Sequence, residues 1–294
     1  MTDRTPTPAS SIDRSRRDFV ALSVATGLGA AAHPVVAALA VNERDVEIKT
    51  ADGTCDAAFF APATGTHPGV VVWPDAAGLR PSMRDIGRRL AGEGYAVLVP
   101  NPFYRIGKAP MFESAANIDF SDAATRAKIG PLMGSVNAAG AAERDAAAYV
   151  AFLDAQAQVD RSRKVGVQGY CMGGALTFRT AASVPERIGG AASFHGGGLV
   201  TDKPDSPHRL IPKMHARVYV GVAANDDQRQ PDAKDQLREA FAAAKVPAEV
   251  EVYPARHGWC VPDMPKEAGS PIYSAPDAER AWGKLLALYR TALV

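Results

Sequence analysis

The sequence predicts an α/β fold in which helices flank a mostly parallel central sheet of about eight strands. Short, continuous apolar runs at 69–75 and 95–100 are typical of strands that are buried on both faces of a sheet. These runs alternate with helical patterns, and a strand–helix–strand order indicates right-handed crossovers between parallel strands. One such sheet uses the whole chain from residue 41 to residue 294, so a single domain is expected.

The expected elements follow in chain order. An antiparallel pair at 45–53 and 55–62, joined by a glycine turn, comes first. The segment 101–135 is rich in Pro, Gly, Phe and Met, and we expect it to be irregular with one short helix at most. The remaining strands are expected at 69–75, 95–100, 164–170, 189–196, 216–225 and 248–255, and the helices at 83–90, 138–156, 175–182, 231–245 and 278–293.

Composition excludes several classes of protein. The 294 residues are 47% hydrophobic and 22% charged, as in ordinary globular proteins, with a net charge of +1. A charge this small gives no electrostatic case for binding nucleic acid or an anionic membrane. The three cysteines, Cys55, Cys171 and Cys260, are odd in number and widely spaced, which fits neither a disulfide framework nor a zinc site. No metal and no cofactor is expected.

Residues 1–40 have the pattern of a secretory signal peptide. A polar start leads into "SRRDFV", an apolar stretch at 20–32 and an Ala-Leu-Ala end at Ala40. Arg16 and Arg17 resemble the pair of a twin-arginine signal, which predicts the twin-arginine translocase as a partner during export. A helix needs about 20 apolar residues to span a membrane, and this apolar stretch is shorter, so no stable anchor is expected. The alternative to a signal peptide is a helical N-terminal extension. If the protein is exported, we expect it to be periplasmic or secreted, and the mature chain to begin near Val41.

The stretch "VGVQGYCMGGALTF" at 165–178 carries the strongest chemical signal. Gly169 and Gly173 lie two residues on either side of Cys171, at the point where a strand gives way to a helix. This is the nucleophile elbow of α/β-hydrolases, with a cysteine in place of serine. The glycines let neighbouring backbone pass where a Cβ would collide. The alternative for this stretch alone is a buried structural cysteine.

A thiol nucleophile needs a base and a group that orients the base. Functional groups in such sheets collect beyond the carboxyl ends of the strands. Of the six histidines only His195 and His257 pass this filter well, and Asp226 or Asp227 follows the strand between them. The order Cys171, Asp227, His257 is the nucleophile–acid–base order of α/β-hydrolases. His257 is therefore the expected base; His195 is the minor alternative and is better interpreted as a pocket wall or structural histidine.

Four sequence blocks together resemble the dienelactone hydrolase family. They are "WPDAAGLRPSMRDIGRRLAGEGYAVLVPNPFYR", "GYCMGG", "AANDDQRQP" and "YPARHGW", and the resemblance covers roughly residues 42–294. It implies a single-domain α/β-hydrolase fold at 41–294, with Cys171 as nucleophile and His257 as base. The family's acid lies four residues before a proline. That spacing implies Asp227, with Pro231 following, and leaves Asp226 as a neighbour.

The resemblance also implies residues that spacing does not assign. A carboxylate after the 69–75 strand contacts the resting thiol in this family, and that position is Asp75 here, where the best-known members have glutamate. The backbone N–H groups of Ala76 and Met172 are implied as the oxyanion hole, which donates to the alkoxide of a tetrahedral intermediate.

Substrate recognition is implied only in part. Dienelactone hydrolases hold a substrate carboxylate with two arginines; Arg105 matches the first, but Val261 stands at the second position. This disfavours a genuine dienelactone and leaves a small ester, thioester or lactone. Tyr104 and Trp259 are candidates for an apolar substrate pocket, with ordinary core packing as the alternative.

The sequence thus predicts an exported hydrolase of small esters or lactones, working through a covalent acyl-thioester on Cys171. The alternative is a non-catalytic periplasmic homologue that binds a small ligand; a redox or metal-handling role is disfavoured because the ligands are too few. Cys260 lies three residues after His257, within about 10 Å of extended chain. We expect Cys260 to be a buried thiol facing away and Cys171 to remain free.

Overall fold

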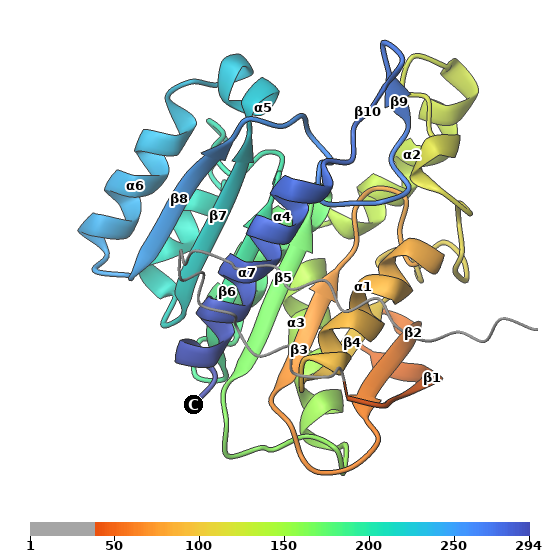
Figure 1. Ribbon diagram of the computed structural model, residues 1–294, viewed down its shortest axis with the longest axis vertical. Coiled ribbons are helices and arrows are strands. Elements are labelled where there is room, and N and C mark those ends of the chain that lie inside the picture. The colour runs from red at the N-terminus through yellow and green to blue at the C-terminus, as the bar shows by residue number, and fades with distance from the viewer. Residues whose placement is uncertain (1–38) are drawn as a thin grey trace, which may run out of the picture. The chain divides into compact units, whose positions relative to one another are not determined.

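The computed structural model describes residues 39–294, which form a central sheet with helices on both faces (Figure 1). The strands of this sheet are β1 (Val41–Thr50), β2 (Gly53–Pro62), β3 (Gly69–Trp73), β4 (Ala96–Pro100), β5 (Val165–Tyr170), β6 (Ile188–Phe194), β7 (Arg217–Ala223) and β8 (Ala248–Tyr253). Their spatial order is β1-β2-β4-β3-β5-β6-β7-β8. The pairs β1–β2 and β2–β4 are antiparallel, and all the others are parallel. The predicted α/β-hydrolase fold is confirmed.

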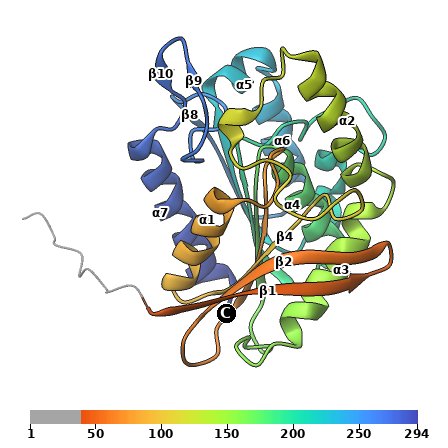
Figure 2. The ribbon, with the colours of Figure 1, turned by 90° about the vertical axis from the view of Figure 1, so that its right-hand side faces the viewer.

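Two helical layers cover the sheet, as Figure 2 shows. One layer holds α1 (Pro81–Gly92) and α7 (Ala275–Ala292), and the other holds α3 (Ala141–Asp154), α4 (Met172–Ser183) and α6 (Ala233–Ala243). Successive residues of a strand point to opposite faces. Val72 therefore packs in the cluster that contains Leu285 of α7, whereas Val71 packs in the cluster that contains Leu153 of α3. Both faces of β3 are buried, which is why its sequence is a continuous apolar run.

The segment 101–135 differs from the expectation. It contains η1 (Ala115–Asn117) and a full helix, α2 (Ala123–Val136), capped by Asp122, whose side chain accepts from the Thr125 N–H. The helix was missed because its apolar residues do not gather on one face and because Pro131 lies inside it.

Three smaller differences lie close to the ends of β7 and β8. The strand expected at 216–225 ends at Ala223, and a short helix, α5 (Ala224–Arg229), follows at once. A 3-10 helix, η2 (Pro207–Lys213), precedes β7. A two-stranded hairpin, β9 (Lys266–Glu267) and β10 (Ser270–Pro271), follows β8 and lies above α7 in Figure 2.

The parallel strands end at one edge of the sheet, so the loops that follow β3, β5, β6, β7 and β8 meet there. No helix within residues 39–294 has the length and apolarity needed to cross a membrane. The predicted signal peptide, including Arg16 and Arg17, lies outside the described residues except for its last two positions.

Candidate active site

Cys171 occupies a strained turn between β5 and α4. Its φ of 52° lies in the left-handed region, which non-glycine residues rarely adopt. A Cβ on Gly169 would lie 2.0 Å from the carbonyl oxygen of Gly173, and one on Gly173 would lie 2.4 Å from that of Trp73. Both glycines are therefore required by close backbone approach, as the elbow pattern predicts.

Two backbone N–H groups beside Cys171 are free to donate. Met172 is the first residue of α4, so its N–H lacks an intrahelical acceptor. Within residues 39–294 the structure gives no acceptor for this N–H or for the Ala76 N–H, whereas the next amide, Ala77, donates to Asp75 Oδ1 at 2.9 Å. Both predicted oxyanion-hole donors are thus unpaired at the edge of the site.

His257 is held by the residues that follow β7. Its backbone N–H donates to Asn225 Oδ1 at 2.8 Å, and its Nδ1 donates to Asp226 Oδ2 at 2.6 Å. Asp227 instead accepts from Lys234 Nζ at 2.8 Å. The expectation that Asp227 is the partner of His257 is therefore wrong. Both acids lie on the short helix α5, where consecutive side chains point in different directions, and Asp226 is the one that faces His257.

The surroundings of His257 favour its charged form. Burial alone would lower the pKa of the imidazole, but the hydrogen bond to Asp226 and the nearby Cys171 thiol outweigh burial and raise the pKa to about 10. His257 is thus an imidazolium at neutral pH, next to the sulfur at the elbow.

His195 lies beside His257, with ring centroids 4.8 Å apart. Its side chain is buried, and its Nδ1 accepts from the backbone N–H of Cys171 at 3.1 Å. That bond leaves the proton on Nε2, which has no hydrogen-bond partner among residues 39–294. Burial, together with the charge of His257, holds the pKa of His195 well below its usual value. His195 is therefore a neutral support of the elbow, which agrees with its expected structural role.

Cys171, His195 and His257 line one cavity of about 270 Å³, together with Ala76 and Asn225. Most of the other lining residues are apolar and come from 115–120 and 264–272. The cavity is where the chemistry-bearing side chains predicted from β5, β6 and β8 meet.

Asp75 lines the same cavity, but its carboxylate is held by Arg80. Arg80 Nη1 and Nη2 donate to its two oxygens at 2.7 and 2.9 Å, and Arg80 also pairs with Asp263. Asp75 and Arg80 are both almost fully buried. Among the described residues no hydrogen bond joins Asp75 to Cys171, although both line the cavity. Asp75 shapes the turn that presents the Ala76 N–H instead.

The three expected substrate-binding side chains lie elsewhere. Arg105 pairs with Asp52 and Asp145, each with a shortest contact of 2.7 Å, and Tyr104 donates to Asp145 as well. Trp259 is fully buried. Its ring stacks on Tyr253, with centroids 4.7 Å apart, and packs edge-on against His195. None of the three lines the cavity of Cys171. The expectation that these three side chains bind substrate is therefore corrected. Arg105 and Tyr104 belong to a structural network with Asp145, and the buried ring of Trp259 packs against His195.

Arg80 and Asn225 are the residues near the site that the sequence did not reveal. Arg80 had one available signal, because it follows Asp75 by five residues in the same loop. Its second partner, Asp263, is 183 residues away along the chain.

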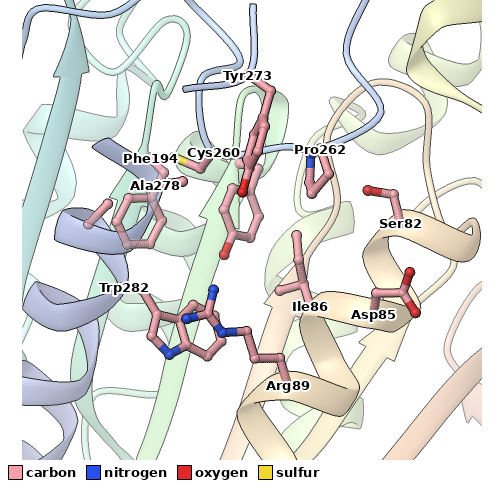
Figure 3. Close-up of a pocket in the computed structure, with 12 residues that line it drawn as sticks. Ser82, Asp85, Ile86, Arg89, Phe194, Cys260, Pro262, Tyr273, Ala278 and Trp282 are labelled. Atoms are coloured by element: carbon pink, nitrogen blue, oxygen red, sulfur yellow. The ribbon is translucent and has the colours of Figure 1, made fainter. Parts of the chain in front are cut away.

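A second cavity, of about 120 Å³, lies between α1 and α7 (Figure 3). Cys260, Phe194 and Trp282 line it, and Arg89 reaches over the ring of Trp282. Burial raises the pKa of the Cys260 thiol well above its usual value. All three cysteines in residues 39–294 are free thiols, and Cys171 and Cys260 face different cavities. The same part of the chain has no cluster of side chains suited to holding a metal ion.

A strained elbow after β5, a histidine after β8 paired with an acid after β7, and two free amides define an α/β-hydrolase. The dienelactone hydrolase family model matches residues 55–293, so the chain belongs to that family.

Relatives and solved structures agree with this assignment. A Methylorubrum extorquens protein whose name, carboxymethylenebutenolidase, is provisional is 29% identical over 94% of this chain and 92% of its own length. The carboxymethylenebutenolidase of Rhodococcus opacus is 27% identical over 65% of this chain and 69% of its own length. The crystal structure of a dienelactone hydrolase-like promiscuous phosphotriesterase from metagenomic libraries has a TM-score of 0.69 at 26% identity, covering 87% of this chain and all of the other. The protein is thus a hydrolase of the ester and lactone class. This conclusion disfavours the alternative of a non-catalytic homologue that only binds a ligand.

Proposed function

We propose that this protein is an exported hydrolase of small carboxylic esters or lactones, with Cys171 as covalent nucleophile, His257 as base and Asp226 as the acid that orients His257. One observation carries the proposal: the elbow thiol shares a cavity with an imidazole whose Nδ1 donates to a carboxylate at 2.6 Å. Asp226 replaces Asp227 in this role because Asp227 is engaged by Lys234.

The first half of the reaction forms an acyl-thioester. The Cys171 thiolate, paired with the His257 imidazolium, attacks the acyl carbon of the ester. The carbonyl oxygen becomes an oxyanion that accepts hydrogen bonds from the N–H groups of Ala76 and Met172. The intermediate collapses by breaking the bond to the alcohol oxygen, and His257 gives its proton to the departing alcohol.

The second half regenerates the enzyme. Neutral His257 takes a proton from a water molecule, whose oxygen attacks the thioester carbon. The same two N–H groups stabilise the second oxyanion. Collapse breaks the carbon–sulfur bond, releasing the carboxylic acid and a thiolate that pairs again with the His257 imidazolium. Asp226 keeps the Nδ1 proton in place throughout, so that Nε2 faces the reaction.

Labelling tests the nucleophile. Iodoacetamide at pH 7 should alkylate Cys171 with parallel loss of esterase activity. Cys55 and Cys260 should remain unmodified, since burial raises the pKa of Cys55 to about 12 and that of Cys260 well above its usual value. Cys171→Ala should be inactive, and intact-mass analysis of wild type quenched during turnover should show the acyl adduct. Full activity of Cys171→Ala would refute the proposal.

Export is the part of the proposal that rests on sequence alone. It is supported by "SRRDFV" with the apolar stretch behind it, and by the Ala-Leu-Ala end before Val41. Replacing both Arg16 and Arg17 by lysine should trap the precursor in the cytoplasm, and the mature N-terminus should lie near Val41. Activity found wholly in the cytosol of cells that carry the unaltered gene would contradict it.

A further inference from the structure

The cavity of Cys171 has an apolar wall. Ile118, Phe120, Met264, Pro265 and Ile272 come from the two segments that flank its mouth, 115–120 and 264–272. Phe120 is 59% exposed and extends the apolar wall outward. A volume of about 270 Å³ suits a small substrate.

Among residues 39–294, no lysine and no arginine lines the same cavity. Its two acids are paired with neighbours: Asp75 with the buried Arg80, which also pairs with Asp263, and Glu267, at the exposed rim, with Arg256 at 3.1 Å. Of the described residues that line it, His257 alone is a cation, and its charge faces Asp226 and Cys171. The arginine that sequence comparison offered for a substrate carboxylate, Arg105, is 13% exposed and is occupied by Asp52 and Asp145.

A carboxylate that enters such a cavity loses water and meets no cation other than His257, whose charge already faces Asp226 and Cys171. Burying an uncompensated charge is far more costly than burying an apolar group of the same size. An uncharged apolar chain, by contrast, gains free energy from contact with Met264, Ile118 and Ile272.

We propose that this site selects uncharged, apolar esters or lactones and rejects substrates that carry a carboxylate. The inference rests on the proposed hydrolase function and adds its substrate class. The relatives' name, carboxymethylenebutenolidase, denotes a lactone substrate that carries a carboxylate. The substrates that we propose for this chain carry none.

Three matched aryl esters test the inference. 4-Nitrophenyl hexanoate, mono-4-nitrophenyl adipate and methyl 4-nitrophenyl adipate share one leaving group and the same acyl chain up to its end, which is a methyl, a carboxylate or a neutral ester. Each rate is divided by the uncatalysed rate of the same ester at pH 7. The kcat/KM of wild type should be about 100-fold lower for the charged ester than for the hexanoate, with the neutral diester close to the hexanoate.

Variants of Met264 separate charge from shape. Met264→Lys places a cation in the wall and should raise kcat/KM for the charged ester about 10-fold while lowering it for the hexanoate. Met264→Gln is polar but uncharged, and should keep the preference of wild type for the neutral esters. Equal or faster turnover of the charged ester by wild type would overturn the inference while leaving the hydrolase proposal intact. No turnover of any of the three esters, with no acyl adduct, would overturn both.

Discussion

The ends of β6 and β8 each place a histidine at the edge of the cavity, and the two side chains differ in charge. His257 meets Asp226 and the Cys171 sulfur, and its pKa is raised to about 10. His195, with its ring centroid 4.8 Å away, meets the backbone N–H of Cys171 and an aromatic neighbour, and its pKa is held well below the usual value. The same residue type thus acts as a cation in one place and as a neutral acceptor in the other, because the partners decide the charge.

The largest expected difference between the two histidines is in catalysis. His257→Ala should lower kcat by about 10³-fold or more, because both proton transfers depend on that imidazole. His195→Ala should lower kcat far less. Steady-state kinetics with 4-nitrophenyl hexanoate measures both, and circular dichroism checks that each variant is folded. The reverse ranking would move the base to His195.

The acids after β7 provide the next test. Asp226→Asn should lower kcat by about 10²-fold or more and shift the NMR titration midpoint of His257 down from about 10, because the carboxylate is what favours the charged ring. Asp227→Asn is the matched control, since Asp227 pairs with Lys234, and it should change neither. A shift of the midpoint by Asp227→Asn instead would restore the assignment made from sequence.

A smaller effect is expected at His195 itself. In His195→Asn the amide oxygen takes the place of Nδ1, and asparagine tolerates the φ of 40° found here. In His195→Gln the amide takes the place of Nε2, so the Cys171 N–H keeps only its other acceptor, the Phe194 carbonyl oxygen at 3.1 Å. We expect the Asn variant to exceed the Gln variant in kcat by about 10-fold, with similar KM. Equal kcat values would show that the hydrogen bond to Cys171 does not matter.

The smallest effect concerns stability and pH. The pKa of His257 is higher in the folded protein than the about 6.5 of an unfolded chain. Its contribution to stability is therefore complete below about pH 6.5 and is lost as pH rises through 10. The free energy of unfolding of wild type should exceed that of Asp226→Asn by on the order of 1 kcal/mol near pH 6, with the gap closing towards pH 10. Urea titrations at several pH values measure the gap; a gap that widens with pH would contradict it.

The sequence predicts what depends on local pattern. Gly169 and Gly173 mark the elbow because a backbone contact there excludes any Cβ, and this constraint is written in the residues themselves. The apolar runs of β3 and β4 indicate buried strands, because both faces of each strand are covered and every residue must therefore suit the interior. Fold class, elbow and both cavity histidines follow from such signals.

The sequence fails where a side chain chooses between distant partners. Spacing to Pro231 favoured Asp227, but the start of α5 at Ala224 turns Asp226 towards His257. Arg105 and Asp75 were assigned to the substrate and the thiol, yet each pairs with a buried residue of opposite charge. The partner of Arg105, Asp145, lies 40 residues away, and Arg80, although close to Asp75 in sequence, has its other partner 183 residues away. Helix α2 was missed because the apolar residues of its sequence do not gather on one face and because Pro131 lies inside it.

The buried bridge from Asp75 through Arg80 to Asp263 has a consequence for how this sequence can change in evolution. Arg80 is the one cation of two carboxylates, so removing Arg80 alone leaves both without a partner charge, a change that typically costs about 3–5 kcal/mol. Exchanging the members together for apolar residues avoids that cost. Position 80 should therefore depend strongly on positions 75 and 263: a saturation library at position 80 alone, screened for folded protein, should return almost only arginine, whereas one that varies the three positions jointly should also return charge-free combinations.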